Sequence, residues 1–591
     1  MKSLLKILPL FTLFFLSCQK EYETLGPKEE LLQQIAQLNQ EIEAFEQIAQ
    51  KNASNKQLQQ SFEKSRLAYK KIEWAVEYFT PEPARFINGP ALDELEVEEN
   101  KFLNPSGFQV IEELIYPTFS AKEKATLQRE IAVLKGLIMQ VKEHVSAITI
   151  SPDYVVDAVK MQMYRIITLG ITGFDSPIAN NSIPEAQASL LALPSVIEKL
   201  PQEPSQIQNS LLDRIRKAAA FCNSAKDFNS FDRTLFIKNY LNPISKNLQE
   251  FQQHYKIANV AKTNAVLQTA SSLFGSKVFN VDAFIPSQEY AYTSAKAQLG
   301  KELFYDTSFS KEGARSCASC HNPELAFTDG LKTNLSLNGS RLLRNTPTLT
   351  YAGLQNAQFW DMRQTDLEKQ SLDVIQNKDE MHGNIRDNIK NISSNPSYKK
   401  LIQKAFPKSK KLEEWQLQNA LASYVRSLNK FNSKFDQHFT EPATALSAEE
   451  QLGFNVFAGK GKCATCHFIP LFNGTVPPAY KKTEQEVIGT PQIKNGKKID
   501  PDLGRYAQYK MPQLLHAFKT PTLRNVALTA PYMHNGVFKS LEEVVVFYNE
   551  GGGAGTGIAV YNQTLPTDKL NLTDKEQKAL VAFMKTLSDS K

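Results

Sequence analysis

The 591-residue chain contains only six cysteines and eight histidines, so it has few side chains that bind metals or cofactors through sulfur or nitrogen. Its net charge is only +6, and its 68 basic and 62 acidic residues are interspersed without long runs. This composition does not favour nucleic-acid binding. After residue 18, no apolar run reaches the roughly 20 residues that a membrane-spanning helix needs. We therefore expect a globular body in which the rare cysteines and histidines are the most informative residues.

Four of the cysteines and two of the histidines form two copies of the pattern C-x-x-C-H. The copies lie at Cys317, Cys320 and His321 and at Cys463, Cys466 and His467. In this pattern two thiols can reach the two vinyl groups of a haem while the histidine binds the iron, so it is typical of covalent c-type haem. Zinc is the main alternative, but three ligands within five residues strain a tetrahedral site and no fourth ligand cluster is evident. A thioredoxin-like redox pair would need a βαβ pattern, which is absent here. The sequence thus predicts two c-type haems.

Residues 1–18 resemble a bacterial lipoprotein signal peptide. Lys2 and Lys6 precede the apolar run from Ile7 to Leu16, and Cys18 would become the lipidated residue. An ordinary secretory leader and a short buried helix are the alternatives. We expect export to the periplasm or cell envelope, with membrane contact only through the lipid on Cys18, and this agrees with haem attachment outside the cytoplasm. Cys222 is left over, and we expect a buried thiol without a disulfide partner.

Residues 19–265 have the pattern of a helical bundle. Apolar residues follow one stripe from Leu31 to Phe45 and another from Leu58 to Phe79 at helical spacing. The segment Gly107 to Glu112 faintly resembles the G-x-H-x-x-E segment of imelysin-like proteins, with Gln109 at the position of the histidine. Because glutamine is a poor ligand for transition metals, we favour a structural or docking role over an iron site.

Residues 275–591 contain an internal duplication. Gln-Leu-Gly precedes each C-x-x-C-H motif, at Gly300 and at Gly453, and an Asn, Thr, Pro and Leu-rich segment follows each motif. Capping boxes at Ser447 and Thr573 predict a helix before the second motif and a closing helix after it. We therefore predict an all-α fold in which the bundle is followed by two tandem cytochrome c-like haem domains, at 275–440 and 441–591.

Longer motifs in the same region resemble the bacterial dihaem cytochrome c peroxidase and MauG family. The segments that carry this resemblance are Gln358 to Arg363, Leu367 to Gln370, Glu380-Met381, Pro521 to Val526 and Ala530 to Gly536. The resemblance covers about residues 275–591, and it implies that His321 belongs to a peroxide-reacting haem and His467 to an electron-transferring haem.

The resemblance also implies roles for several other residues. Trp360 would lie between the haems and pass electrons, while Glu380 and Gln370 would be the carboxylate and amide above the first iron. Val374 stands where the family usually has proline. Oxygen atoms of three residues would bind one calcium ion, two of them through backbone carbonyls. These residues are Asn345, Thr529 and Pro531.

Two positions depart from conventional members of the family. Leu337 stands where a histidine caps the first iron, so we expect an open, high-spin first haem that needs no reductive activation; His382 is a weaker candidate ligand. Tyr548 stands where the second iron has an axial methionine, and this is the MauG-like choice, since a phenolate favours oxidised iron. Met511 or Met533 would be the alternative ligand.

We expect a peroxidase that reduces hydrogen peroxide with electrons from a small c-type cytochrome or cupredoxin. The alternatives are a MauG-like oxidase that acts on a protein or small molecule and, least favoured, a non-catalytic dihaem electron-transfer protein. An electron carrier gains nothing from an open iron beside Glu380 and Gln370, so these residues argue against the last reading.

Overall fold

The computed structural model describes residues 26–51, 53–96, 101–200, 203–261 and 265–590. The predicted signal peptide and Cys18 lie outside the described residues. The strands in these ranges form two short antiparallel pairs, β1 (Glu94–Glu96) with β2 (Lys101–Leu103) and β3 (Gln485–Glu486) with β4 (Phe518–Lys519). The remaining regular structure is helical, which confirms the predicted all-α class. None of the helices in the described ranges combines the length with the apolar character that spanning a bilayer requires.

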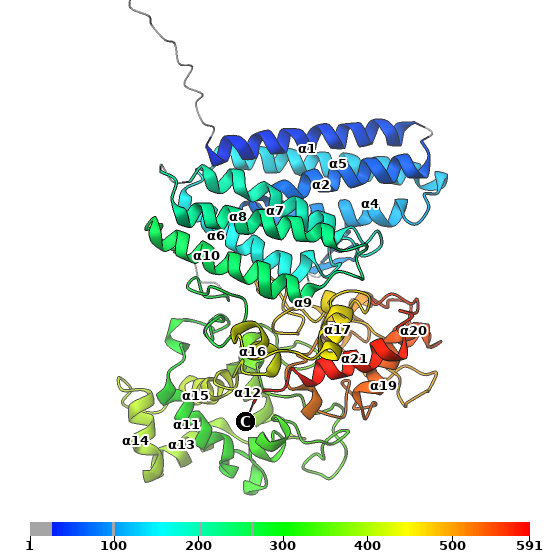
Figure 1. Cartoon of the computed structure of the whole chain (residues 1–591). Coiled ribbons are helices and arrows are strands. Elements are labelled where there is room, and N and C mark those ends of the chain that lie inside the picture. Colours follow the sequence, from blue (N-terminus) through cyan, green and yellow to red (C-terminus); the bar gives the residue numbers. More distant parts are fainter. Residues whose placement is uncertain (1–25, 52, 97–100, 201–202, 262–264, 591) are drawn as a thin grey trace, which may run out of the picture.

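The first half of the chain forms a layer of long helices that lies on top of the rest of the molecule in Figure 1. Its helices are α1 (Pro27–Gln50), α2 (Asn55–Phe79), α3 (Pro81–Asn88), α4 (Phe108–Ile115), α5 (Lys124–Ala147), α6 (Pro152–Arg165), α7 (Ser182–Glu198), α8 (Gln206–Phe221), α9 (Arg233–Phe236) and α10 (Asn242–His254). The stripe from Leu31 to Phe45 is fully buried, and the stripe that begins at Leu58 is buried up to the half-buried Phe79. Burial of these stripes holds α1 and α2 together.

Charged side chains fill the centre of this bundle. Arg66 binds Glu185 at 2.6 Å, while Lys70 and Arg165 each place a nitrogen 2.6 Å from Asp175. Each of these cations is buried against a carboxylate, which offsets the cost of taking charge out of water.

Gln109 lies beside this network. Its side chain donates a 2.9 Å hydrogen bond to the Asn88 carbonyl oxygen, and it is buried. Within the described residues no cluster of histidine, cysteine and carboxylate side chains could hold a metal ion. The contacts of Gln109 are those of a structural residue.

The second half of the chain is built on two equivalent helix pairs. Its helices are α11 (Ser294–Tyr305), α12 (Leu367–Gln376), α13 (Ile385–Ser394), α14 (Pro396–Ala405), α15 (Glu414–Arg426), α16 (Lys434–Thr440), α17 (Ala448–Phe457), α18 (Tyr506–Tyr509), α19 (Leu541–Asn549), α20 (Gly552–Gly555) and α21 (Asp574–Lys585). Helix α11 crosses α15, and α17 crosses α21.

The repeated Gln-Leu-Gly segments lie where these helices cross. A Cβ atom on Gly300 would lie 1.9 Å from the Ala420 carbonyl oxygen, and one on Gly453 would lie 1.9 Å from the Ala579 carbonyl oxygen. Only glycine permits such an approach between two backbones. The predicted capping boxes at Ser447 and Thr573 are both confirmed. The domain boundaries at residues 265, 275 and 440 stay predictions.

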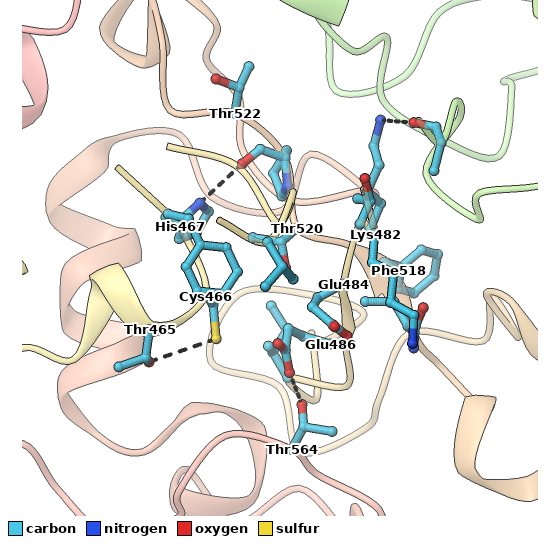
Figure 2. A pocket seen from close by; sticks show the side chains of 18 of the residues that line it. Thr465, Cys466, His467, Lys482, Glu484, Glu486, Phe518, Thr520, Thr522 and Thr564 are labelled. Carbon is cyan, nitrogen blue, oxygen red and sulfur yellow. Dashed lines mark hydrogen bonds between the residues drawn. The ribbon is translucent and has the colours of Figure 1, made fainter. Parts of the chain in front are cut away.

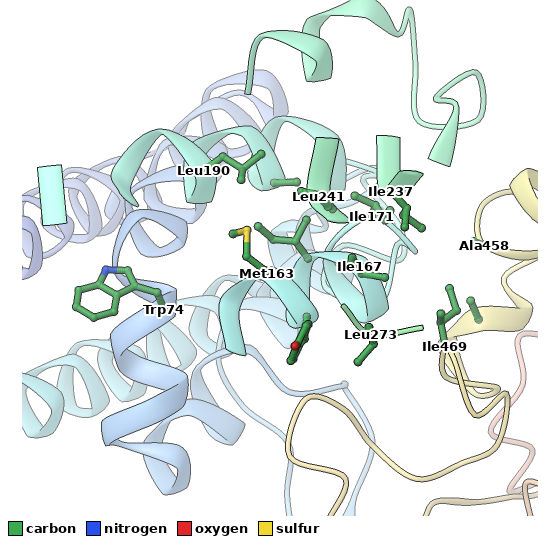
Figure 3. Packing of buried hydrophobic residues seen from close by; sticks show 14 of the residues in the cluster. Trp74, Met163, Ile167, Ile171, Leu190, Ile237, Leu241, Leu273, Ala458 and Ile469 are labelled. Carbon is green, nitrogen blue, oxygen red and sulfur yellow. The ribbon is translucent and has the colours of Figure 1, made fainter. Parts of the chain in front are cut away.

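The bundle and the second C-x-x-C-H region share one apolar core. Figure 3 shows Ala458 and Ile469 at the edge of the cluster that contains Ile167 and Leu273. Ala464, inside the second motif itself, is fully buried in the same cluster. The core around the first motif forms a separate cluster. The bundle is therefore packed firmly against the second haem-binding region.

Arg233 of α9 is buried where the bundle meets α17. The guanidinium of Arg233 donates to the carbonyl oxygens of Ile171, Phe231 and Phe228 at 2.8, 3.1 and 2.9 Å, and its backbone nitrogen donates to Asn455 at 2.9 Å. Burial lowers the pKa of Arg233 to about 9, with Asp232 working against that shift. The side chain thus satisfies three carbonyl groups that would otherwise be buried without a donor.

We expect Arg233→Ala to lower the free energy of unfolding by about 3 kcal/mol, because three buried carbonyl groups lose their donor. Urea unfolding followed by circular dichroism measures this change. The matched control is Arg216→Ala, which removes an exposed ion pair with Glu198 and should change stability by less than about 1 kcal/mol. Equal stability of the two variants would contradict the role of Arg233.

Candidate functional site

One large cavity joins both C-x-x-C-H motifs. Its volume is about 2150 Å³, and His321, Cys320, His467, Cys463 and Cys466 all line it. Figure 2 shows the part around the second motif, where Glu484, Glu486 and Thr520 lie beside His467 and Cys466. Residues of the bundle close one side of this space. These include Phe174, Pro177 and Ile178.

Both histidines are oriented in the way that an iron ligand requires. Nδ1 of His321 lies 2.9 Å from the Phe327 carbonyl oxygen, and Nδ1 of His467 lies 3.2 and 3.1 Å from the carbonyl oxygens of Phe472 and Pro521. Donation from Nδ1 leaves the lone pair of Nε2 free for a metal. Burial lowers the pKa of His321 and lowers that of His467 to about 4, so both rings are neutral, as iron ligation demands. These residues fit a haem at each motif.

Burial also affects the four cysteines of the motifs. It raises the pKa of Cys317 and Cys463 to about 12, and it also raises the pKa of Cys320 and Cys466. The preference for haem over zinc stays a prediction from the spacing of the motifs.

Glu380 and Gln370 both line the cavity, and the charge of Glu380 adds to the raised pKa of Cys320 in the first motif. Burial raises the pKa of Glu380, while Arg363 and a hydrogen bond from Asn377 work against that shift. The Asn377 side-chain amide donates to Oε1 of Glu380 at 2.7 Å. Val374 also lines this part of the cavity. The arrangement presents a carboxyl group with a raised pKa, fixed by an amide, to the space beside the first motif.

The loop that carries Leu337 is tied to the loop that carries Glu380. The backbone nitrogen of Leu337 donates to the Asp379 carbonyl oxygen at 2.9 Å, and Arg315 donates to the Leu335 carbonyl oxygen at 2.9 Å. His382 is exposed and lies outside the lining of the cavity. Of the histidines in the described residues, only His321, His467 and His534 line the cavity.

Trp360 lies at the junction between the two motif regions. Its indole nitrogen donates to the Asn345 carbonyl oxygen at 2.9 Å, and its own carbonyl oxygen accepts from the Lys519 backbone nitrogen at 2.7 Å. Beside it, Arg344 binds Asp361 at 2.7 Å and Asp502 at 2.6 Å. These bonds connect segments 344–361 and 502–519, and they hold the indole in the wall of the shared cavity.

Tyr548 lies at the second motif and lines the cavity with Cys463 and Cys466. Burial raises the pKa of its phenol, and Cys466 and Cys463 add to that shift. Met533 lines the cavity too, whereas Met511 is buried in a cluster with Val487, Leu514 and Ala517.

The three residues expected to bind calcium, Asn345, Thr529 and Pro531, all line the cavity. The backbone nitrogen of Asn345 donates to the His534 carbonyl oxygen at 2.6 Å, so Asn345 contacts the segment that follows Pro531. The side-chain nitrogen of Asn345 donates to the Leu331 carbonyl oxygen at 2.9 Å.

Sequence reasoning missed three contributors to the site. Asn377 could have been found, because asparagine favours turns in which its side chain accepts from the backbone two residues on, as Oδ1 of Asn377 does from Asp379. Glu486, which is half-buried beside Cys466 and accepts a hydrogen bond from Thr564, carries no sequence signal. Neither does Phe174, whose ring packs edge-on against Phe468 of the second motif region at 5.7 Å.

The chain is similar to known dihaem peroxidases and to MauG proteins. The family described as Di-haem cytochrome c peroxidase matches residues 294–444. The chain is 34% identical over 310 residues to cytochrome-c peroxidase IdrP2 of Denitromonas iodatirespirans, covering 49% of this chain and 81% of that protein. It is 31% identical over 297 residues to the methylamine utilization protein MauG of Methylorubrum extorquens, covering 50% and 78%. A crystal structure of a MauG-like protein associated with microbial copper homeostasis is 29% identical, with a TM-score of 0.47, over 52% of this chain and 94% of that one.

Proposed function

Because the chain belongs to the family of dihaem cytochrome c peroxidases and MauG proteins, we propose that it reduces hydrogen peroxide at the His321 haem with electrons that pass through the His467 haem. The observation that carries this proposal is the half-buried Glu380 carboxyl group, which lies in the same cavity as His321 and is fixed by Asn377. The electrons would come from a small c-type cytochrome or cupredoxin.

Haem at each motif would relay electrons from the external donor, and the haem held by His321 would provide the iron site at which the oxygen–oxygen bond breaks. The four cysteines would attach the two groups covalently, and the Nε2 atoms of His321 and His467 would bind the irons. Reduction of one hydrogen peroxide to two waters consumes two electrons and two protons. We assign proton transfer to Glu380, since a carboxyl group with a raised pKa can take a proton from one oxygen and give it to the other. Asn377 fixes the carboxyl group, and Gln370 orients the peroxide.

We propose that the first iron is open at rest. The position of the capping histidine is held by Leu337, and the bond from Leu337 to Asp379 ties that loop to the Glu380 loop. The exposed position of His382 supports the same interpretation. Such a site would be high-spin and would need no reduction before peroxide enters.

We propose Tyr548 as the second axial ligand of the His467 iron. It lines the cavity together with Cys463 and Cys466, and Met511 lies in a separate buried cluster. A phenolate ligand stabilises oxidised iron. This observation favours a second candidate function, a MauG-like oxidase that stores oxidising equivalents and acts on a protein or small molecule. A purely electron-carrying role has less support, because it gives Glu380 no task.

Three finer assignments belong to the same proposal. Cavity-lining Asn345, Thr529 and Pro531 would bind one calcium ion between the haem regions through oxygen atoms. Trp360 would conduct electrons between the haems. Covalent haem and the lipoprotein-like leader both point to an exported protein anchored by lipid on Cys18, and this anchor would be the only membrane contact.

Glu380→Gln should lower kcat for peroxide reduction by about a hundredfold to ten-thousandfold, because the amide cannot shuttle a proton. Steady-state turnover with a reduced small cytochrome measures this loss, and the optical spectrum of the haems should stay unchanged. The matched control is Glu324→Gln, which alters an exposed carboxylate close in sequence to His321. Full turnover in Glu380→Gln would refute the assignment.

Tyr548→Met should convert the second haem to a low-spin form with histidine and methionine ligands, because the thioether replaces the phenolate. Electron paramagnetic resonance of the ferric protein detects the change. Tyr561→Met, at a side chain that is 76% exposed, should keep the wild-type spectrum. A histidine–methionine signal already present in the wild type would instead assign Met533 or Met511 as the ligand.

A further inference from the structure

Tyr351 is a fully buried phenol with a carboxylate beside it. Its hydroxyl group donates to Oδ1 of Asp589 at 2.7 Å and accepts from the backbone nitrogen of Phe431 at 2.9 Å. Tyr351 has a φ of +61°, a left-handed conformation that is uncommon for a residue other than glycine. Its side chain is only 1% exposed. The fold thus holds this phenol in a fixed and costly position.

Asp589 is itself held in place. Its backbone nitrogen donates to Oδ1 of Asn525 at 2.8 Å, and its Oδ2 accepts from Nδ2 of Asn525 at 2.9 Å. Oδ1 of Asp589 remains directed at the phenol of Tyr351. The carboxylate is therefore placed to receive the phenolic proton without any movement of the chain.

A chain of direct contacts connects Tyr351 to the second haem ligand. The Phe472 carbonyl oxygen accepts the hydrogen bond from Nδ1 of His467. The fully buried guanidinium of Arg524 stacks over the Phe472 ring at 5.4 Å and over the Tyr351 ring at 5.3 Å. Two side chains, Arg524 and Phe472, therefore separate Tyr351 from His467. They lie on the Nδ1 side of the His467 ring, opposite the Nε2 atom that would bind the iron.

Arg524 also restricts how Tyr351 could be oxidised. A positive guanidinium this close to the ring makes a ring that carries positive charge unfavourable. Asp436 partly compensates the guanidinium, since it binds both terminal nitrogens at 2.5 and 2.9 Å. Burial raises the pKa of Tyr351, with Arg524 working against that shift, so the resting phenol is protonated. Loss of an electron must therefore be accompanied by loss of the proton.

We propose that Tyr351 is a redox-active tyrosine that delivers an electron to the second haem after peroxide has oxidised the enzyme. One electron leaves the Tyr351 ring and reduces the oxidised haem by one equivalent. The phenolic O–H bond breaks, and the proton forms an O–H bond with Oδ1 of Asp589. The product is a neutral tyrosyl radical that accepts a hydrogen bond from the Phe431 nitrogen and from the new Asp589 hydroxyl. An external electron donor and return of the proton restore the phenol. This inference rests on the proposed function, which supplies the oxidant.

Other tyrosines in the described ranges also bind carboxylates but lack this placement. Tyr78 and Tyr116 lie in the bundle and bind Asp157 and Glu63. Tyr398 binds Asp306 at 2.6 Å in the first haem-binding region. It has the same pair of groups as Tyr351, but no stacking contact links it to a haem ligand, so Tyr398 provides a matched control.

The test uses the full-length protein with both haems. The ferric protein is mixed with stoichiometric hydrogen peroxide in the absence of an electron donor, frozen, and measured by electron paramagnetic resonance, with optical spectra taken in parallel. We expect a tyrosyl radical signal in the wild type and in Tyr398→Phe. Tyr351→Phe keeps the ring but should lose the signal, and Asp589→Asn should reduce it because an amide is a poor proton acceptor.

The outcomes separate this inference from the proposed function. If the optical spectra show that peroxide has oxidised the haems beyond the ferric state but the wild type gives no tyrosyl signal, Tyr351 is not the redox-active residue. The same conclusion follows if Tyr351→Phe keeps that signal. If hydrogen peroxide leaves the haem spectrum unchanged, the proposed function fails and this inference fails with it. Loss of the signal in Tyr351→Phe, with wild-type haem spectra, would support the assignment.

Discussion

The hydrogen bonds from the two proximal histidines to backbone carbonyl groups determine the rest of the site. Each bond fixes a neutral ring and directs its free nitrogen into the shared cavity. The carbonyl groups belong to Phe327, Phe472 and Pro521, which lie in the loops that follow or return to each motif. A change in those loops would therefore move the ligand. Asn345, downstream of the first motif, accepts a hydrogen bond from Trp360, and Arg524, close to Pro521, stacks over Tyr351. The segments that orient the two histidines therefore also hold Trp360 and Tyr351.

The two haem sites are unequal in their surroundings although they come from a repeated sequence. At the first motif the cavity wall supplies a polar group with a raised pKa, Glu380, and we propose that Leu337 leaves the iron without a protein cap. At the second motif the wall supplies Tyr548, and the bundle closes the space with Phe174. The bundle shares its apolar core with the second region, so it is part of the wall of that haem site. This arrangement suits a reactive first iron and a protected second iron.

Much of this architecture could be predicted from the sequence. The C-x-x-C-H spacing predicts two sets of haem ligands, and residues of both motifs line one cavity in the structure. The apolar stripes correctly predict α1 and α2, and the repeated glycines mark the places where the structure brings two helices into backbone contact. Contacts between distant segments could not be predicted. Arg233 bonds to carbonyl groups of Ile171 and Phe228, and nothing local in the sequence encodes those partners. The pairing of Tyr351 with Asp589 joins residues far apart in the chain and likewise appears only once the chain is folded.

We propose that the first iron is open in the fully oxidised enzyme, while a protein ligand closes the second. Rapid mixing of the fully ferric protein with hydrogen peroxide, followed by optical spectroscopy, distinguishes an open iron from a capped one. We expect a high-spin first haem that reacts at once, without prior reduction by an electron donor. Two low-spin, six-coordinate haems that react only after one of them has been reduced would show instead that a protein ligand caps the first iron.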